Sequence, residues 1–216
     1  MFYRRALEAY HELVTLDIPI EAVINEAKRQ LDQEYAKMAN VMNLEWLTCV
    51  KEKGEAFRGV TLGRQQNFYR TEGDGTVKQV VIVSDALRYE VAVELMQQLA
   101  KEKHIATLTP YLAMLPTETK YCKPALLPHQ SLELQVTDML VDGAVLTTTE
   151  QRTAHLGKYK EGAVCMRYEE VMNGDLSTMR EQFKRPLVYI FHDTIDEASH
   201  SQSPFEVIAA DRKSVV

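Results

Sequence analysis

The first part of the chain has the hydrophobic pattern of helices. Residues 3–15 and 20–50 are both helix-like. In the second stretch, apolar side chains recur at spacings of three, four and seven and form one stripe, with charged residues between, at Ile24, Leu31, Tyr35, Met38 and Met42. This spacing predicts an amphipathic helix. We expect a helical pair that packs on its own domain or on another domain.

From residue 78 the pattern changes to short apolar runs that alternate with helix-like segments. The runs lie at residues 80–83, 105–108, 163–166 and 187–191, with amphipathic stretches such as 89–101 between them. This alternation predicts βαβ units, and continuous apolar runs are typical of strands buried on both faces. We expect an α/β domain with a mostly parallel sheet and flanking helices, preceded by an α-helical segment.

A polar, glycine-containing stretch at residues 51–78 separates the two patterns. Its composition predicts an exposed connection, and the residues 72–75 (EGDG) predict a tight turn just before the first strand. We therefore expect a helical lead-in over residues 1–60 and the α/β domain over residues 61–216.

Charge and cysteine content narrow the class of protein. The chain has 216 residues and a formal net charge of −6, which gives no general electrostatic reason to bind nucleic acid. No run reaches the ~18 apolar residues that a membrane span needs. The three cysteines are widely spaced and form no CxxC pair. We expect a reduced, cytoplasmic protein without membrane contact.

Polar side chains directly follow the first and the last expected strands: Ser84, Asp85, His192, Asp193, and then Asp196 and His200. The carboxyl ends of parallel strands share one edge of the sheet, where ligands bind in open α/β folds. Carboxylates with a histidine can hold a divalent metal ion, and a hydroxyl beside such an ion can become a nucleophile. Hydroxyls are supplied by Thr117 and Thr119, just before a segment at 121–127 that is expected to open a helix.

Each of these signals also has a purely structural explanation. Asp85 is a good N-cap for the helix that follows it, and Thr117 and Thr119 are good capping residues as well. Asp196 and His200 are one helical turn apart, so they would share a helix face as a solvated pair. Taken singly, none of the signals decides between the two explanations.

Three motifs in the same order resemble the PglZ domain, a branch of the alkaline phosphatase superfamily. They are SDALRYE at residues 84–90, LPTETK with ALLPH within 115–129, and VYIFHDTID at 188–196. Segments at 66–69, 141–143 and 151–152 are also similar, and they extend the match to about residues 60–200. The surrounding sequence resembles the type A PglZ proteins of BREX bacteriophage-defence systems.

The resemblance implies a two-metal phosphoryl-transfer site. Asp85 would bind the first metal ion together with Thr119, and Thr119 would also attack phosphorus. Thr117 is the alternative nucleophile. Arg88 belongs to the first motif and would either contact phosphate oxygens or form a structural ion pair.

The resemblance assigns the second metal ion to Asp196 and His200, with His192 nearby as a ligand or a supporting group. The superfamily takes its last ligands from an Asp-His-Gly sequence, which does not occur in this chain. A catalytic zinc ion usually has three protein ligands and a water. We therefore expect two divalent ions, which the resemblance indicates to be zinc, with the second half of their ligand set missing.

Cys122, Lys123 and Pro124 stand where the family has small and apolar residues. We expect a truncated copy of a metal-dependent phosphatase or phosphodiesterase domain with an incomplete alkaline-phosphatase-like core. The alternative is a non-catalytic scaffold or interaction module with a vestigial metal site. Other phage-defence proteins are the expected partners, and the phosphoester substrate is not indicated. A Rossmann-type nucleotide binder is disfavoured because no G-x-G-x-x-G follows the first strand.

Overall fold

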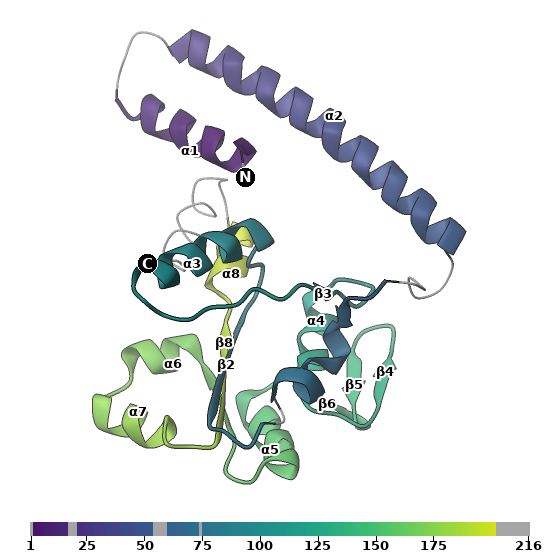
Figure 1. Ribbon diagram of the computed structural model, residues 1–216, viewed down its shortest axis with the longest axis vertical. Coiled ribbons are helices and arrows are strands. Elements are labelled where there is room, and N and C mark those ends of the chain that lie inside the picture. The colour runs from purple at the N-terminus through teal and green to yellow at the C-terminus, as the bar shows by residue number, and fades with distance from the viewer. Residues whose placement is uncertain (1, 17–20, 54–59, 74, 202–216) are drawn as a thin grey trace. The chain divides into compact units, whose positions relative to one another are not determined.

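The computed structural model describes residues 2–16, 21–53, 60–73 and 75–201 (Figure 1). They fall into two compact units, one that reaches Thr61 and one that extends from Leu62 to Ser201. The expected domain boundaries stay a prediction, because the last fifteen residues of the chain, 202–216, lie outside the described ranges. In the described part of the chain, no helix has the length and apolarity to cross a membrane.

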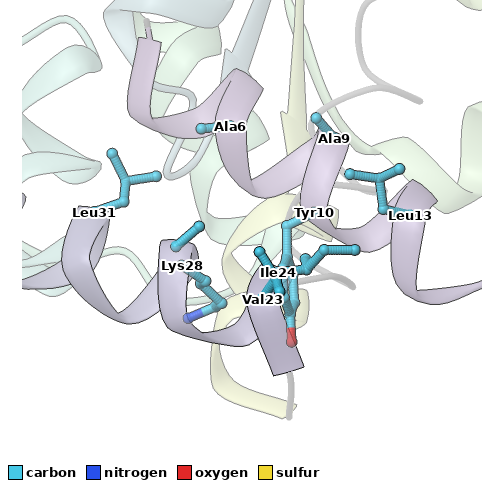
Figure 2. A pocket seen from close by; sticks show the side chains of 9 residues that line it. Ala6, Ala9, Tyr10, Leu13, Val23, Ile24, Lys28 and Leu31 are labelled. Atoms are coloured by element: carbon cyan, nitrogen blue, oxygen red, sulfur yellow. The ribbon is translucent and has the colours of Figure 1, made fainter. Parts of the chain in front are cut away.

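The N-terminal unit is a pair of helices, α1 (Phe2–Val14) and α2 (Glu21–Lys53), as the sequence predicts. The ring of Tyr3 stacks on that of Tyr35 with 3.9 Å between centroids, and its hydroxyl donates to Asp32. Figure 2 shows the apolar groove between the two helices, lined among others by Ala6, Ala9, Leu13, Ile24 and Leu31.

The apolar stripe of α2 divides into two parts. Ile24 and Leu31 are half-buried and line the groove against α1. Further along the helix, Tyr35, Met38 and Met42 are 42%, 51% and 59% exposed. The C-terminal half of the stripe is therefore open to solvent in this structure.

The second unit is built around a parallel sheet of three strands in the order β2-β8-β7. The strands are β2 (Gln79–Ser84), β7 (Val164–Arg167) and β8 (Leu187–His192). Three of the four expected apolar runs are thus strands, and all pairs are parallel. This confirms an α/β domain with an α-helical segment before it.

The central strand β8 is buried on both faces. Leu187, Tyr189 and Phe191 point into one core cluster, while Val188 and Ile190 point into a second one. The edge strand β2 differs, because it packs one face on the core and leaves Val80 and Ile82 exposed. Burial on both faces therefore holds for the central strand and is wrong for β2.

The expected strand at residues 105–108 is wrong. These residues are irregular, and Ile105 is fully exposed. An apolar run becomes a strand only where a neighbouring strand pairs with its backbone groups. Among the described residues, the next strand is the two-residue β3 (Tyr111–Leu112), which pairs with β1 (Gly63–Arg64) and not with the central sheet.

Between the strands of the parallel sheet, the chain forms the helices α3 (Tyr89–Lys101), α5 (Thr149–Tyr159), α6 (Tyr168–Asn173) and α7 (Leu176–Gln182). α8 (Thr194–Ser201) follows β8. α3 has the bounds that the sequence predicts. Figure 1 shows α6 and α7 on one side of the β2–β8 pair and the smaller strands on the other. α6 and α7 cover Val188 and Ile190 through Tyr168, Val171 and Met179.

A small antiparallel sheet, which the sequence did not lead us to expect, completes the unit: β4 (Leu132–Leu134), β5 (Met139–Val141) and β6 (Ala144–Val145). Asp142 and Gly143 form the turn between the last two strands with φ of 50° and 78°. Both angles are positive, as a two-residue hairpin turn of this kind requires. The connection before β2 contains the short helical turns Gln65–Asn67 and Tyr69–Gly73.

Candidate active site

The ends of β2 and β8 are aligned at the same edge of the parallel sheet. Ser84 and His192 are paired in the strand register, and Ser84 Oγ lies 2.8 Å from His192 Nδ1. The backbone N–H of Asp85 then donates to the carbonyl of His192 at 2.9 Å. This pairing places the acids that follow the two strands, Asp85 and Asp193, at one sheet edge, as expected from the sequence.

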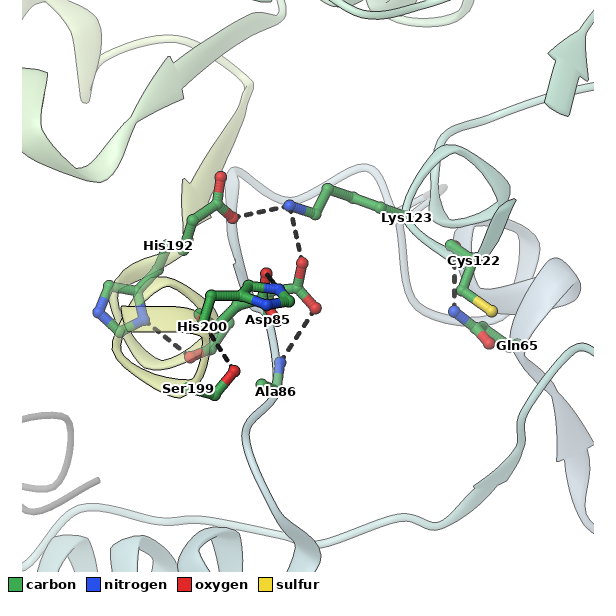
Figure 3. Close-up of polar contacts among 11 residues, drawn as sticks. Gln65, Asp85, Ala86, Cys122, Lys123, His192, Ser199 and His200 are labelled. Carbon is green, nitrogen blue, oxygen red and sulfur yellow. Dashed lines mark hydrogen bonds and ion pairs between the residues drawn. The ribbon is translucent and has the colours of Figure 1, made fainter. Parts of the chain in front are cut away.

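Lys123 joins the two acids. Its Nζ lies 2.9 Å from Oδ2 of Asp85 and 2.7 Å from Oδ1 of Asp193. Figure 3 shows the lysine side chain pointing toward Asp85 from the segment that carries the threonine motif. Oδ1 of Asp85 accepts from the backbone N–H of Ala86, while its buried Oδ2 accepts no well-aligned hydrogen bond within the described residues. Its contact with Lys123 is therefore an ion pair.

The electrostatics of this edge favour a charged lysine and a neutral histidine. Burial acts to lower the pKa of Lys123, but the hydrogen bond to Asp193 and the negative charges of Asp85 and Asp193 outweigh it and raise that pKa above the ordinary value. Burial lowers the pKa of His192 below its ordinary value, although the negative charges of Asp193 and Glu169 act to raise it. The neutral imidazole packs edge-to-face on Tyr168, with 4.5 Å between ring centroids.

The threonine motif forms two short turns instead of the helix expected over residues 121–127. α4 (Thr119–Cys122) is followed by a 3-10 turn, Pro124–Leu126. Pro124 lacks the N–H that would continue an α-helix, so the turn ends there. The segment is held on the sheet by the Tyr189 hydroxyl, which donates to the carbonyl of Leu126 at 3.1 Å.

The capping explanations do not hold for the three candidate residues. The N-cap of α4 is Glu118 and that of α3 is Arg88, and neither side chain makes a capping hydrogen bond. Asp85 therefore does not cap the helix that follows it. Thr119 is the first residue of α4, and both it and Thr117 are exposed.

A cationic pocket lies beside the ion-pair cluster. Its volume is about 170 Å³, and its polar lining comes from Thr119, Lys120, Lys123, Asp138, Thr147 and Arg152. The guanidinium of Arg152 lies 4.4 Å from the ring centroid of Phe191, and its Nε donates to the carbonyl of Leu146. Two of the pocket's three cations are already paired with acids: Lys120 lies 3.3 Å from Glu118, and Lys123 contacts Asp85 and Asp193. We refer to it below as the cationic pocket.

Lys123 and Arg152 are site residues that the sequence analysis did not single out for a role. Arg152 belongs to a segment that resembles the PglZ family, and Lys123 was noted only as a departure from it. The only indication in the sequence was that each of the two matched segments contains a basic residue. Their joint position depends on the packing of α5 and the threonine motif against β8.

Asp196 and His200 lie one turn apart on α8, as predicted. Oδ2 of Asp196 is 3.5 Å from Nε2 of His200, and the imidazole is exposed. Arg88 is exposed as well, at the start of α3. The proposed metal and phosphate roles of these residues stay predictions.

The side chains at this edge do not fit the expected pair of zinc ions. Among the described residues, no three His, Cys, Asp or Glu side chains are grouped closely enough to hold a metal ion. The ammonium of Lys123 already lies against the carboxylate that would be the first ligand. Burial, together with the charge of Asp85, raises the pKa of Cys122, so its thiol is not a ready thiolate ligand.

The parallel sheet with acids at its strand ends is consistent with an incomplete alkaline-phosphatase-like core. The family model described as "BREX system PglZ alkaline phosphatase-like domain" matches residues 66–211. The chain therefore belongs to this PglZ family.

Two curated relatives agree with that family. The alkaline phosphatase-like protein PglZ of Bacillus cereus (strain H3081.97) is 28% identical over 180 residues, which cover 79% of this chain and 21% of the relative. The alkaline phosphatase-like protein BrxZ of Escherichia coli O9:H4 (strain HS) is 35% identical over 156 residues, which cover 65% of this chain and 17% of the relative. The chain thus spans about a fifth of the length of these relatives.

Proposed function

We propose that the unit at Leu62–Ser201 binds phosphoesters for a BREX defence protein and is of the phosphatase or phosphodiesterase type. The observation that carries the proposal is the convergence of Asp85, Asp193 and Lys123 at the ends of two parallel strands. This is the edge at which open α/β folds bind their ligands. The alkaline phosphatase-like description of the matching family supports the same class of chemistry.

The cationic pocket is the proposed phosphate-binding site. Guanidinium and ammonium groups are the side chains that bind phosphate oxygens most strongly. An ammonium has three N–H donors, so the contacts of Lys123 with two carboxylates leave one donor for a phosphate oxygen. Arg152 would supply a second charged contact. Arg88 does not line this pocket, and its phosphate contact stays a prediction from the family resemblance.

Thr119 is the proposed nucleophile, with Thr117 as the alternative. Its Oγ would form a bond to phosphorus as the bond from phosphorus to the leaving oxygen breaks, and the hydroxyl proton would pass to that oxygen. Water would then cleave the phosphothreonine and release phosphate. Lys123 and Arg152 would stabilise the charge on the phosphoryl oxygens during both steps.

The remaining expectations stay predictions. Of the two divalent ions that the family resemblance implies, the one at Asp85 with Thr119 would compete with the ammonium of Lys123, and the one at Asp196 with His200 stays a prediction. A zinc titration tests both. His192 stays the predicted neighbour of the second ion. A cytoplasmic location and other defence proteins as partners are likewise proposed.

The test measures binding and turnover separately on residues 1–216. Binding of inorganic phosphate is followed by calorimetry, and hydrolysis is followed with p-nitrophenyl phosphate and its diester. We expect Arg152→Gln to weaken phosphate binding about tenfold, as loss of one charged contact does. Arg180→Gln, on the exposed face of α7, is the matched control and should bind as the wild type does.

Thr119→Ala should abolish hydrolysis and keep phosphate binding, whereas Thr117→Ala should keep both. The reverse result would assign the nucleophile to Thr117. If the wild type binds no phosphate, or if Arg152→Gln binds it as tightly as the wild type, the proposal is wrong.

A second candidate function is a non-catalytic interaction module of the defence complex. The exposed half of the α2 stripe, at Tyr35, Met38 and Met42, favours it, because exposed apolar stripes of this kind are typical of interaction sites. This function predicts no hydrolysis by the wild type. It also predicts that polar substitutions in the stripe weaken binding to another BREX protein while the ion-pair cluster remains intact.

A further inference from the structure

The ammonium of Lys123 connects segments that are far apart in the chain. It contacts Asp85 after β2 and Asp193 after β8, the latter seventy residues away. The lysine side chain is 12% exposed, and the two acids are 18% and 40% exposed. The cluster is therefore a partly buried tertiary contact, unlike the exposed pairs within single helices such as Lys37 with Glu34.

The two acids need a cation between them. Neighbouring strands of a sheet lie about 4.8 Å apart, so carboxylates that follow paired strand ends repel one another. A partly buried site increases this repulsion, because solvent screens it less. The ammonium offsets it, since it lies within 3 Å of an oxygen of each acid.

A metal ion and this ammonium compete for the same oxygen. Zinc binds carboxylate oxygens at about 2.0–2.2 Å. A zinc ion on Oδ2 of Asp85 would lie close to an ammonium that is itself 2.9 Å from that oxygen. Two cations at such a separation repel strongly in a partly buried site.

We propose that Lys123 is the internal cation of this site and takes the place of a divalent metal ion between Asp85 and Asp193. The salt bridges of Lys123 with Asp85 and Asp193 occupy the strand ends. The two carboxylates bind zinc only when the lysine side chain is replaced. The inference concerns the site of the proposed function, but it does not rest on phosphoester binding.

The test is a zinc titration by calorimetry on residues 1–216. Lys123→Met removes the charge and keeps an unbranched side chain of similar length, and Lys123→Arg keeps the charge. We expect no Asp85-dependent zinc binding by the wild type or by Lys123→Arg. Lys123→Met should bind zinc at least about tenfold more tightly, since one like charge is removed from the immediate surroundings of the ion.

Asp85 provides the control for zinc bound elsewhere, for example by Asp196 and His200. The gain in Lys123→Met should disappear in the double variant with Asp85→Ala. Thermal unfolding gives a second measurement: Lys123→Met should unfold at a lower temperature than the wild type, and zinc should restore most of the difference.

Zinc binding by the wild type that is lost in Asp85→Ala would overturn the inference. So would a Lys123→Met variant with the zinc affinity and unfolding temperature of the wild type. If Lys123→Met does not fold without metal, recovery of its circular dichroism spectrum on addition of zinc supports the inference, and no recovery contradicts it. None of these results depends on phosphate, so a failure of the proposed function is observed separately.

Discussion

Ser84 and His192 occupy paired positions on two neighbouring parallel strands, and their side chains meet with 2.8 Å between Oγ and Nδ1. The imidazole is buried, so this hydroxyl replaces a water that the ring nitrogen would otherwise bind. The pair lies directly before the two acids that Lys123 joins. It therefore fixes the strand ends from which the candidate site is built.

Ser84→Ala should lower the free energy of unfolding by about 1 kcal/mol, the usual net contribution of one hydrogen bond. Chemical unfolding followed by circular dichroism measures the difference. In a His192→Phe background the same substitution should cost less than half as much, because the partner nitrogen is gone. Equal costs in the two backgrounds would show that the hydrogen bond does not stabilise the fold.

Asp142 should make the fold sensitive to acid. Burial acts to raise its pKa, but the Tyr159 hydroxyl and the amides of Ser131 and Gln130 outweigh it and hold the pKa below the ordinary value of 3.8. A carboxyl with a lowered folded pKa stabilises the fold above its unfolded pKa. That stability is lost as the pH falls through the folded value.

Asp142→Asn keeps an oxygen acceptor and tolerates the positive φ of this position, but it does not titrate. Near neutral pH the variant should be less stable than the wild type by roughly 1–2 kcal/mol. The difference should shrink as the pH is lowered below the ordinary carboxyl pKa, as measured by urea unfolding over a pH series. A difference that does not change with pH would contradict this assignment.

Leu156 should be one of the most sensitive positions in the core. It lies on α5, is fully buried, and packs in the same cluster as Leu187 and Tyr189. Leu156→Ala should cost about 2–5 kcal/mol, because it leaves a cavity. Leu176→Ala is the matched control on an exposed position and should change stability by less than about 0.5 kcal/mol. Since Trp46 lies in the N-terminal unit, circular dichroism is a better probe here than tryptophan fluorescence.

Thr148 should stabilise the start of α5, the helix that carries Arg152. Its hydroxyl accepts from the N–H of Gln151 at 3.2 Å, and the Gln151 side chain accepts from the N–H of Thr148. Thr148→Ala should cost about 0.5–2 kcal/mol, and Thr148→Ser should cost little because it keeps the capping oxygen. Equal stability of the two variants, measured by thermal unfolding, would mean that the capping hydrogen bond of Thr148 does not stabilise α5.

Local pattern was sufficient for the elements whose structure depends on near neighbours. The bounds of α3, the central strand β8 and the pairing of Asp196 with His200 on one helix face all follow from spacing along the chain. The same reasoning failed at residues 105–108, which have the apolar character of a strand but no strand beside them among the described residues. It also failed at Pro124, where ring geometry divides the expected helix into two turns.

The amino-acid sequence by itself determined the α/β class, the helical lead-in, and the PglZ motifs with Asp85 at the end of the first strand. Only the tertiary structure determined which side chain contacts that acid. An ion pair depends on distance through space, and Lys123 is separated from Asp193 by seventy residues that no local pattern connects. The order of strands at the sheet edge brings these groups within 3 Å, and at that distance the lysine occupies the place that the motifs alone assign to a metal ion.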